Sequence, residues 1–432
     1  MSSYETVKAV CARGLVLAPV AALLLSVVLL LLGNGLLGTL LVVRASQEGF
    51  RSEIIGIMMS AYFAGYTAGA FFLPRLVISV GHIRTFAGFA AISSMAALIH
   101  LALIEPWAWM VLRAVTGLAY AGMILVTESW LNAHAVQSTR GQLLSIFGAI
   151  SMGAWALGQA LLNLAPPEGI ALFLVVSVLI SAAVVPITLL PSRPPADTDQ
   201  EPLSFQSLFR TSPLAAIGVL MAGFAIGGFW GMGPNFAQQL GLGVASISAF
   251  MAAVLAGTLV LQWPLGWLSD TLPRHLVIAG ASLGATVAAL GLASATNASL
   301  PVLLMVGALF GGFGIPIYSL CVAQANDSLV PSQMLGAARG LLLLNGLGTA
   351  VGPFAGSLAM AALGPGGLFL YAAVLLAMLA LAALPQLQKV TFRRTVSTRC
   401  PHTPQLTVSL NAMLQARPSG SLPTSDQNQS GK

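Results

Sequence analysis

Long apolar stretches separated by short polar turns follow one another along almost the whole chain. A bilayer core requires about 20 apolar residues per helix. Twelve segments of suitable length occur: residues 15–43, 54–73, 86–104, 107–130, 143–164, 170–190, 215–236, 247–265, 276–294, 300–322, 341–360 and 368–384. The pattern predicts an all-α membrane protein with twelve transmembrane helices. The first apolar run exceeds the roughly 7–15 residues of a cleaved signal peptide, so we interpret it as a retained helix.

The longest polar break separates six of these segments from the other six. Residues 191–213 are rich in Pro, Asp and Ser, which indicates a cytoplasmic linker between an N-terminal six-helix bundle, residues 1–190, and a C-terminal one, residues 214–387. Residues 388–432 are polar and basic and have too little apolar surface to form a core. We expect them to form a disordered cytoplasmic tail.

The composition supports a membrane protein and argues against catalytic and metal sites. The chain is 57% hydrophobic and 7% charged, with a mean hydropathy of +0.89, whereas soluble proteins carry about 25% charged residues. The three cysteines and five histidines are scattered, so we expect no disulfide framework, no metal and no cofactor. HExxH and paired intramembrane acids are absent from the sequence, which argues against an enzyme.

The positions of the basic residues predict the orientation in the membrane. With the N-terminus inside, every Lys and Arg except Arg44, Arg51 and Arg113 falls on the cytoplasmic side. The net charge of +6 lies in loops and the tail, a distribution that does not indicate a nucleic-acid partner. We therefore expect a multi-pass plasma (inner) membrane protein with cytoplasmic N- and C-termini.

A charged element occurs twice, at the ends of the fourth and tenth predicted spans. ESWLNAHAVQSTRG, residues 128–141, and DSLVPSQMLGAARG, residues 327–340, both begin with an acid and Ser and end with Arg-Gly. The acids could simply end their helices while the arginines anchor to headgroups. We favour ion pairs that form a cytoplasmic gate and stabilise an outward-open state. The simplest pairs are Glu128/Arg140, Asp327/Arg339 and Asp270/Arg274, and pairing across the two halves is an equal alternative.

Two short motifs resemble those of the major facilitator superfamily. GWLSDTLPRH matches its loop pattern G-x-L-S-D-R-x-G-R-R at Gly266, Leu268, Ser269, Asp270 and Arg274, although Thr271 and Pro273 depart from it. RAVTG, residues 113–117, fits the pattern R-x-x-x-G. ESWLN, GHIR, QWPLGWLSD and QAND are similar to the YcaD-like branch. The resemblance implies two pseudo-symmetric six-helix bundles that work by alternating access.

Two other motifs are less complete. The first-half counterpart of the loop keeps Arg84 but has no acid, so a gate there would be weaker or would use Glu128. GTAVGPFAG resembles an antiporter motif of the fifth span but lies in the eleventh, which puts antiport in doubt. We assign Gly266 of GWLSDTLPRH and the small residues of GTAVGPFAG to helix packing, the latter being Gly348, Gly352, Pro353 and Gly356.

Polar and aromatic residues inside the spans are the candidates for a substrate site near the midplane. They are Asn34, Tyr62, Tyr66, Arg113, Tyr120, Gln159, Gln262, Tyr318, Gln324 and Asn345, with Trp155 and Trp263 as aromatic walls. Each could instead join helices by hydrogen bonds. Arg113 should face the bundle interior, where it could hold an anion, help to move protons or pair with Asn, Gln or backbone carbonyls.

The sequence therefore predicts a secondary active transporter for a neutral or mildly anionic small organic solute. We expect a monomer in the lipid bilayer, with protons as the candidate coupling ion and efflux favoured over uptake. The alternative is a non-transporting receptor or scaffold that uses the linker or the basic tail. Solute flux after deletion of the tail would distinguish the two functions.

Overall fold

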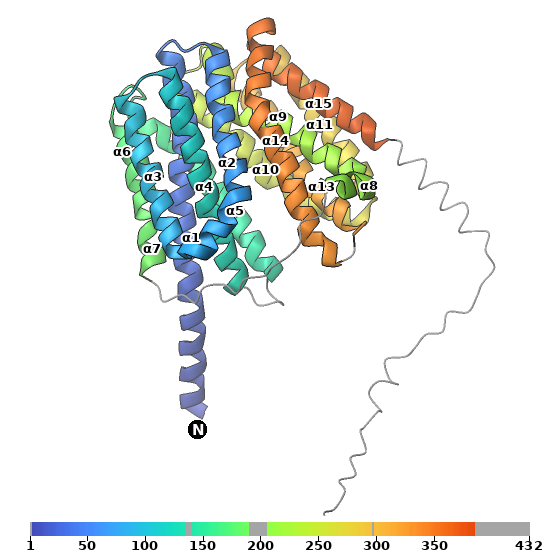
Figure 1. Cartoon of the computed structure of the whole chain (residues 1–432). Coiled ribbons are helices and arrows are strands. Elements are labelled where there is room, and N and C mark those ends of the chain that lie inside the picture. Colours follow the sequence, from blue (N-terminus) through green and yellow to red (C-terminus); the bar gives the residue numbers. More distant parts are fainter. Residues whose placement is uncertain (1, 135–139, 190–204, 296–297, 330, 385–432) are drawn as a thin grey trace, which may run out of the picture. The chain divides into compact units, whose positions relative to one another are not determined.

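The computed structural model describes residues 2–134, 140–189, 205–295, 298–329 and 331–384, and within them the side chains except those of residues 2–20, 132–134, 140–145, 205–207 and 331–335. These residues belong to one compact unit and are helical almost throughout (Figure 1). The predicted tail, residues 388–432, and most of the predicted linker lie outside the described residues.

The helices follow one another with short connections. Their bounds are α1 Ser2–Gln47, α2 Ser52–Val80, α3 His82–Ala102, α4 Pro106–His134, α5 Arg140–Ala160, η1 Leu161–Leu164, α6 Ala171–Ala182, α7 Val184–Thr188, α8 Phe205–Thr211, α9 Pro213–Gln239, α10 Val244–Thr271, α11 Arg274–Ser294, α12 Leu300–Gly314, α13 Ile317–Asn326, α14 Pro331–Leu363 and α15 Gly367–Ala383.

Within the described residues, eleven segments are long and apolar enough to cross a membrane. Each of the twelve predicted spans falls on one of these segments or on α15, which has 17 residues and is the shortest of the matching apolar segments. The prediction of an all-helical chain with many apolar spans is therefore confirmed. It succeeds because bilayer thickness fixes helix length, and helix length is visible in the sequence.

Two of the spans contain breaks that the hydropathy pattern did not predict. α12 ends at Gly314 and α13 begins at Ile317, with Pro316 between them. α6 ends at Ala182, four residues before Pro186. A proline has no N–H to donate to the carbonyl four residues earlier, which weakens the helix at that point. Both breaks leave the flanking segments apolar, so each still counts as one span.

Glycines allow two helix pairs to pack at backbone contact. A Cβ atom added to Gly117 in α4 would collide with the Tyr62 carbonyl oxygen of α2, and one added to Gly65 would collide with Ala114. α10 and α12 make the same kind of contact through Gly257 and Gly311. Small residues at such crossings are typical of membrane helices, which gain stability from close packing.

The small residues that the motifs predict to pack helices together lie close to neighbouring helices in α14 but not at Gly266. In α14, Gly348 and Gly352 lie against the backbone of α9, and Pro353 lies against Gly231 of that helix. Gly356 faces the Leu368 side chain of α15. Gly266 differs, because an added Cβ atom there would meet nothing within 4 Å. The predicted close helix contact at Gly266 is therefore not present in this conformation.

Part of the predicted linker is helical. α8, Phe205–Thr211, lies within residues 191–213, and its Leu208 side chain is buried. A Cβ atom added to Gly340 of α14 would lie 3.2 Å from the Leu208 side chain. This segment is thus packed against the helices, although its composition is that of a linker.

Candidate functional site

The two ends of the helices can be named by their turns. α1 and α2 are joined near Gly49, and α2 and α3 are joined at Gly81, where φ is positive in both turns. Hydrogen bonds link the first turn to residues near Glu168 and Gln239. We call this the Gly49 end and the opposite one the Gly81 end.

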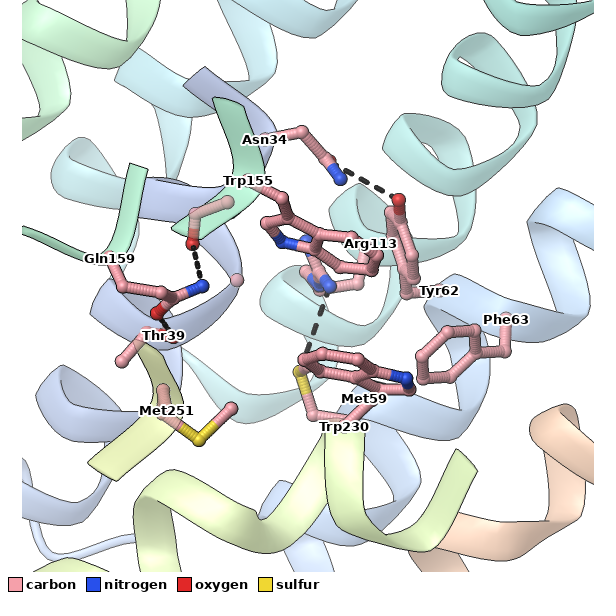
Figure 2. Close-up of a pocket in the computed structure, with 12 residues that line it drawn as sticks. Asn34, Thr39, Met59, Tyr62, Phe63, Arg113, Trp155, Gln159, Trp230 and Met251 are labelled. Carbon is pink, nitrogen blue, oxygen red and sulfur yellow. Dashed lines mark hydrogen bonds between the residues drawn. The ribbon is translucent and has the colours of Figure 1, made fainter. Parts of the chain in front are cut away.

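A pocket lies among six helices, between the two ends (Figure 2). α1, α2, α4 and α5 contribute from the part of the chain before the predicted linker, and α9 and α10 contribute from the part after it. The lining residues are Asn34, Gly35, Gly38, Thr39, Met59, Tyr62, Phe63, Arg113, Trp155, Gln159, Trp230 and Met251. The walls are mostly apolar with a few polar groups, a composition typical of small-molecule sites.

Arg113 is the charged residue of the described pocket lining, and it is 1% exposed. Its guanidinium carbon lies 4.0 Å from the centre of the Tyr62 ring, a cation–π contact. Its Nη2 lies 3.7 Å from the Met59 sulfur, and Figure 2 shows this contact. Its Nε and Nη1 have no hydrogen-bond partner among the described residues. Arg113 thus lies in the interior, but it contacts a thioether and an aromatic face rather than the expected amides or carbonyls.

Gly117 explains why Tyr62 reaches Arg113. The glycine lies one helical turn along α4 from the arginine and brings the α2 backbone into contact at Tyr62 itself. The Tyr62 hydroxyl then donates to Asn34 Oδ1 at 3.2 Å. The R-x-x-x-G motif therefore combines a buried cation with the small residue that sets the distance to its aromatic neighbour.

A second polar group joins α1 to α5 on the pocket wall. Thr39 Oγ1 donates to Gln159 Oε1 at 2.5 Å, and Gln159 Nε2 donates to the Gly35 carbonyl oxygen at 3.2 Å. Gln159 is buried, so both ends of its amide are satisfied within the protein. These bonds hold the wall in place and leave Gln159 little capacity for a ligand in this conformation.

Two tryptophans from different helices stack at the pocket. The rings of Trp155 in α5 and Trp230 in α9 have centroids 4.6 Å apart and an interplanar angle of 13°. The pair spans the two parts of the chain on either side of the predicted linker. A movement of one part against the other would therefore have to separate these rings.

The structure brings together only some of the predicted substrate-site residues. Asn34, Tyr62, Arg113, Trp155 and Gln159 line the pocket. The remaining candidates do not: they are Tyr66, Tyr120, Gln262, Tyr318, Gln324 and Asn345, together with the predicted wall Trp263.

These other candidates have varied surroundings. The Tyr120 ring lies 6.4 Å from that of Tyr62 and 5.9 Å from that of Tyr66, so both tyrosines adjoin the pocket. Asn345 donates to the Val219 carbonyl oxygen at 3.0 Å and thereby joins α14 to α9. Trp263 is 77% exposed on α10.

Sequence reasoning missed seven lining residues. Thr39 and Trp230 are a polar and an aromatic residue inside predicted spans, so the rule that selected the other candidates could have found them. The other five have apolar side chains or none, and the same residue types occur throughout the spans: Gly35, Gly38, Met59, Phe63 and Met251.

Polar contacts join the two parts of the chain at the Gly49 end. Ser52 Oγ accepts from Asn235 Nδ2 at 3.1 Å and from Gln239 Nε2 at 2.8 Å. Asn163 Nδ2 donates to Ser248 Oγ at 3.1 Å, and Ser248 Oγ donates to the Gln159 carbonyl oxygen at 2.7 Å. α2, α5 and η1 are thereby attached to α9 and α10.

Some of the predicted gate residues meet at the Gly81 end. Arg274 Nε lies 2.6 Å from Asp327 Oδ2, and Arg274 Nη2 lies 3.5 Å from Asp270 Oδ1. Arg274 thus joins the α10–α11 turn to the end of α13, within the second part of the chain.

The other predicted gate residues also belong to the Gly81 end. Arg84, Glu128 and Arg339 are exposed at the same end. The Arg140 side chain lies outside the described residues, so the predicted Glu128/Arg140 pair is not described. The gating role of all these residues stays a prediction.

Comparison with known proteins identifies the family. The family model for the Major Facilitator Superfamily matches residues 23–344 and 215–399. The "Uncharacterized MFS-type transporter YcaD" of Salmonella paratyphi A is 27% identical over 340 residues, which cover 78% of this chain and 87% of the relative. The protein of the same name from Salmonella typhi has the same identity and coverage.

Solved transporter structures share the fold. The nucleoside transporter NupG matches with a TM-score of 0.71 at 14% identity, covering 86% of this chain and 98% of that one. A bacterial homologue of the lysosomal transporter Spinster, inward-facing and unoccupied, matches with a TM-score of 0.63 at 13% identity, covering 85% and 94%. The relatives are transporters and not enzymes, as the sequence predicts. The chain is a YcaD-like, multi-pass membrane protein and belongs to the Major Facilitator Superfamily.

Proposed function

We propose that this membrane transporter is a secondary active carrier that moves a small organic solute by alternating access. Two six-helix bundles, residues 1–190 and 214–387, would move against each other around the pocket of Arg113 and Trp155. In this scheme α15 is the twelfth transmembrane helix. Export and proton coupling stay predictions of the sequence.

The observation that carries this proposal is a pocket whose wall is shared by both parts of the chain, with hydrogen bonds joining these parts near one end. Trp155 stacks on Trp230 across the boundary, and Ser248 and Asn163 join the same two parts nearer the Gly49 end. Hydrogen bonds between side chains contribute about 0.5–1.5 kcal/mol each. A few such contacts can hold one state without preventing the change to another.

The basic residues support an orientation for this state. Their distribution favours an orientation with the Gly81 end in the cytoplasm and the Gly49 end outside. With the two parts joined at the Gly49 end, the conformation is then inward-facing. The Arg274–Asp327 contact lies within one bundle, so in this state it does not join the two bundles.

Accessibility of a pocket cysteine tests alternating access. Gly38 lines the pocket, and an added Cβ atom there meets nothing within 4 Å, so Gly38→Cys introduces a thiol with little disturbance. Cys11, Cys321 and Cys400 are first replaced by alanine. We expect a membrane-impermeant maleimide to label Gly38→Cys from the cytoplasmic side in inside-out vesicles, and more slowly from the outside in intact cells.

The controls are single cysteines at the two ends. Glu105→Cys, at the Gly49 end, should react from the outside only, and Thr271→Cys, at the Gly81 end, from the cytoplasm only. Labelling of Gly38→Cys from the outside should disappear when Asn163→Cys and Ser248→Cys are joined by a disulfide. A pocket thiol that reacts from one side under all conditions would contradict alternating access and favour a receptor or scaffold.

A further inference from the structure

The buried guanidinium of Arg113 has no negative partner among the residues that the structure describes. None of the described pocket-lining residues is an Asp or Glu, and the charged side chains among the buried described residues are those of Arg44 and Arg113. Arg44 forms an ion pair with Glu48 at 2.5 Å near the Gly49 end. Arg113 therefore differs from Arg44, because its charge is not balanced by a nearby described carboxylate.

The free donors of Arg113 are specific atoms. Nε and Nη1 lack a hydrogen-bond partner, and Nη2 contacts only the Met59 sulfur, which is a weak acceptor. Nε and Nη1 lie on different edges of the guanidinium, and each shares its edge with Nη2. One N–H of Nη2 is directed at the Met59 sulfur, so the edge on its other side can offer two parallel N–H groups to one incoming oxyanion, the geometry in which arginine binds carboxylates. A buried charge without a partner has an unfavourable free energy in the empty protein. Binding of an anion at Arg113 removes that contribution.

The neighbours of Arg113 do not supply the missing charge. Tyr62 presents its ring face to the cation, and its hydroxyl donates to Asn34. His100 is buried, and its Nδ1 lies 2.6 Å from the Ala96 carbonyl oxygen, so that nitrogen carries the proton. A histidine in this state is neutral, and it would be positive if it gained a second proton.

The rest of the pocket limits the anion to one charge and an apolar body. No second cation lines the pocket within the described residues, which disfavours a dianion such as a phosphate ester. Trp155, Trp230, Met59 and Met251 provide apolar and aromatic surface next to the guanidinium. Such a wall suits a hydrocarbon or aromatic group attached to a carboxylate.

We propose that the pocket binds a small organic monocarboxylate, with its carboxylate on Arg113 and its apolar part against Trp155 and Trp230. The inference rests on the proposed transport function and specifies its substrate class. It also assigns a use to the one cation that the sequence places within the hydrocarbon region. Separation of the Trp155–Trp230 stack would give the apolar part room to enter.

A binding panel on the purified full-length chain tests this inference. The probes are acetate, hexanoate, benzoate and 3-phenylpropanoate, each compared with its neutral primary amide, together with benzylamine and inorganic phosphate. Binding is followed by tryptophan fluorescence and by thermal stability in detergent. We expect at least one of the three larger carboxylates to bind about tenfold or more tightly than its amide, and phosphate and benzylamine to bind weakly.

Substitutions then locate the site. Arg113→Gln should weaken carboxylate binding about tenfold or more, and Arg113→Lys should retain part of it because the charge remains. Arg51→Gln is the matched control, since Arg51 is exposed, pairs with Glu53 and lies outside the pocket. If no carboxylate binds better than its amide, or if Arg113→Gln binds equally well, the inference is wrong. Labelling of Gly38→Cys from both sides, in inside-out vesicles and in intact cells, would then show that the transport proposal still stands.

Discussion

The α2–α4 pair and the α10–α12 pair have the same kind of backbone contact but different side chains around it. Gly65 and Gly117 allow the first pair to approach, and Gly257 and Gly311 allow the second. Next to the first contact lies Arg113, a buried cation that lines the pocket. The comparison suggests that close packing is a property of the scaffold, whereas the side chains beside it decide where a solute can bind.

A cluster of aromatic side chains, instead of a polar site, lies next to the second contact. The Phe310 ring lies 5.6 Å from that of Phe229 and 5.3 Å from that of Phe369, and both contacts are edge-to-face. Phe236 lies 4.7 Å from Phe369 in the same arrangement. These rings are fully buried, so this region is a dry core. The candidate site is therefore asymmetric, with its cation in the first part of the chain.

The largest expected effect contrasts this core with the pocket. Phe310→Ala should lower the free energy of unfolding by about 3–5 kcal/mol, because it leaves a cavity among packed rings. Arg113→Met should leave stability unchanged or raise it, because it removes a buried charge without a counterion. Denaturation in detergent measures both. A loss at Arg113→Met as large as that at Phe310→Ala would show that the arginine is a structural residue.

The next effect tests whether the two backbone contacts are equivalent. Gly117→Ala and Gly311→Ala should each lower the free energy of unfolding by about 1–3 kcal/mol, since the new methyl group meets a neighbouring backbone carbonyl in both cases. Gly266→Ala is the control and should change stability by less than about 0.5 kcal/mol, because its surroundings are open. Thermal unfolding of the three variants checks this. If alanine is tolerated at only one of these two glycines, the two backbone contacts are not equivalent.

The smallest effect concerns the charged groups at the Gly81 end. The first-half turn has no acid, whereas Arg274 contacts Asp327 at 2.6 Å and Asp270 at 3.5 Å. These acids are half or more exposed, so each contact contributes about 0–1 kcal/mol. Asp327→Asn should shift the ratio of Gly38→Cys labelling rates from the two sides by up to about fivefold, and Asp270→Asn by less. A larger effect at Asp270 would contradict the observed geometry.

The sequence predicted the spans well because hydropathy and helix length follow directly from the bilayer. It also predicted that Arg113 would be buried, since a charge exposed to lipid is costly. Its partners could not be predicted, because Met59 and Tyr62 approach it only through the crossing of α2 and α4. The same holds for the Trp155–Trp230 stack, whose members lie far apart in the sequence.

The errors have related causes. Trp263 and Gln262 are an aromatic and a polar residue inside a predicted span, but neither lines the pocket. Hydropathy averages over a window and does not register which face of a helix points inward. Arg274 contacts Asp327 of another turn as well as Asp270 of its own, whereas the simplest pairs expected from spacing lie within one turn.

The most direct test of the account is the distance across the Gly49 end. Spin labels at Leu164→Cys and Ala245→Cys, both exposed next to the Asn163–Ser248 contact, report on the separation of the two parts of the chain by pulsed electron paramagnetic resonance. A second pair at Ser79→Cys and Thr271→Cys reports on the Gly81 end. The account predicts a short and a longer distance at each end, whose populations change in opposite directions when a bound carboxylate such as benzoate is added. One unchanging short distance at the Gly49 end, with and without the ligand, would contradict it.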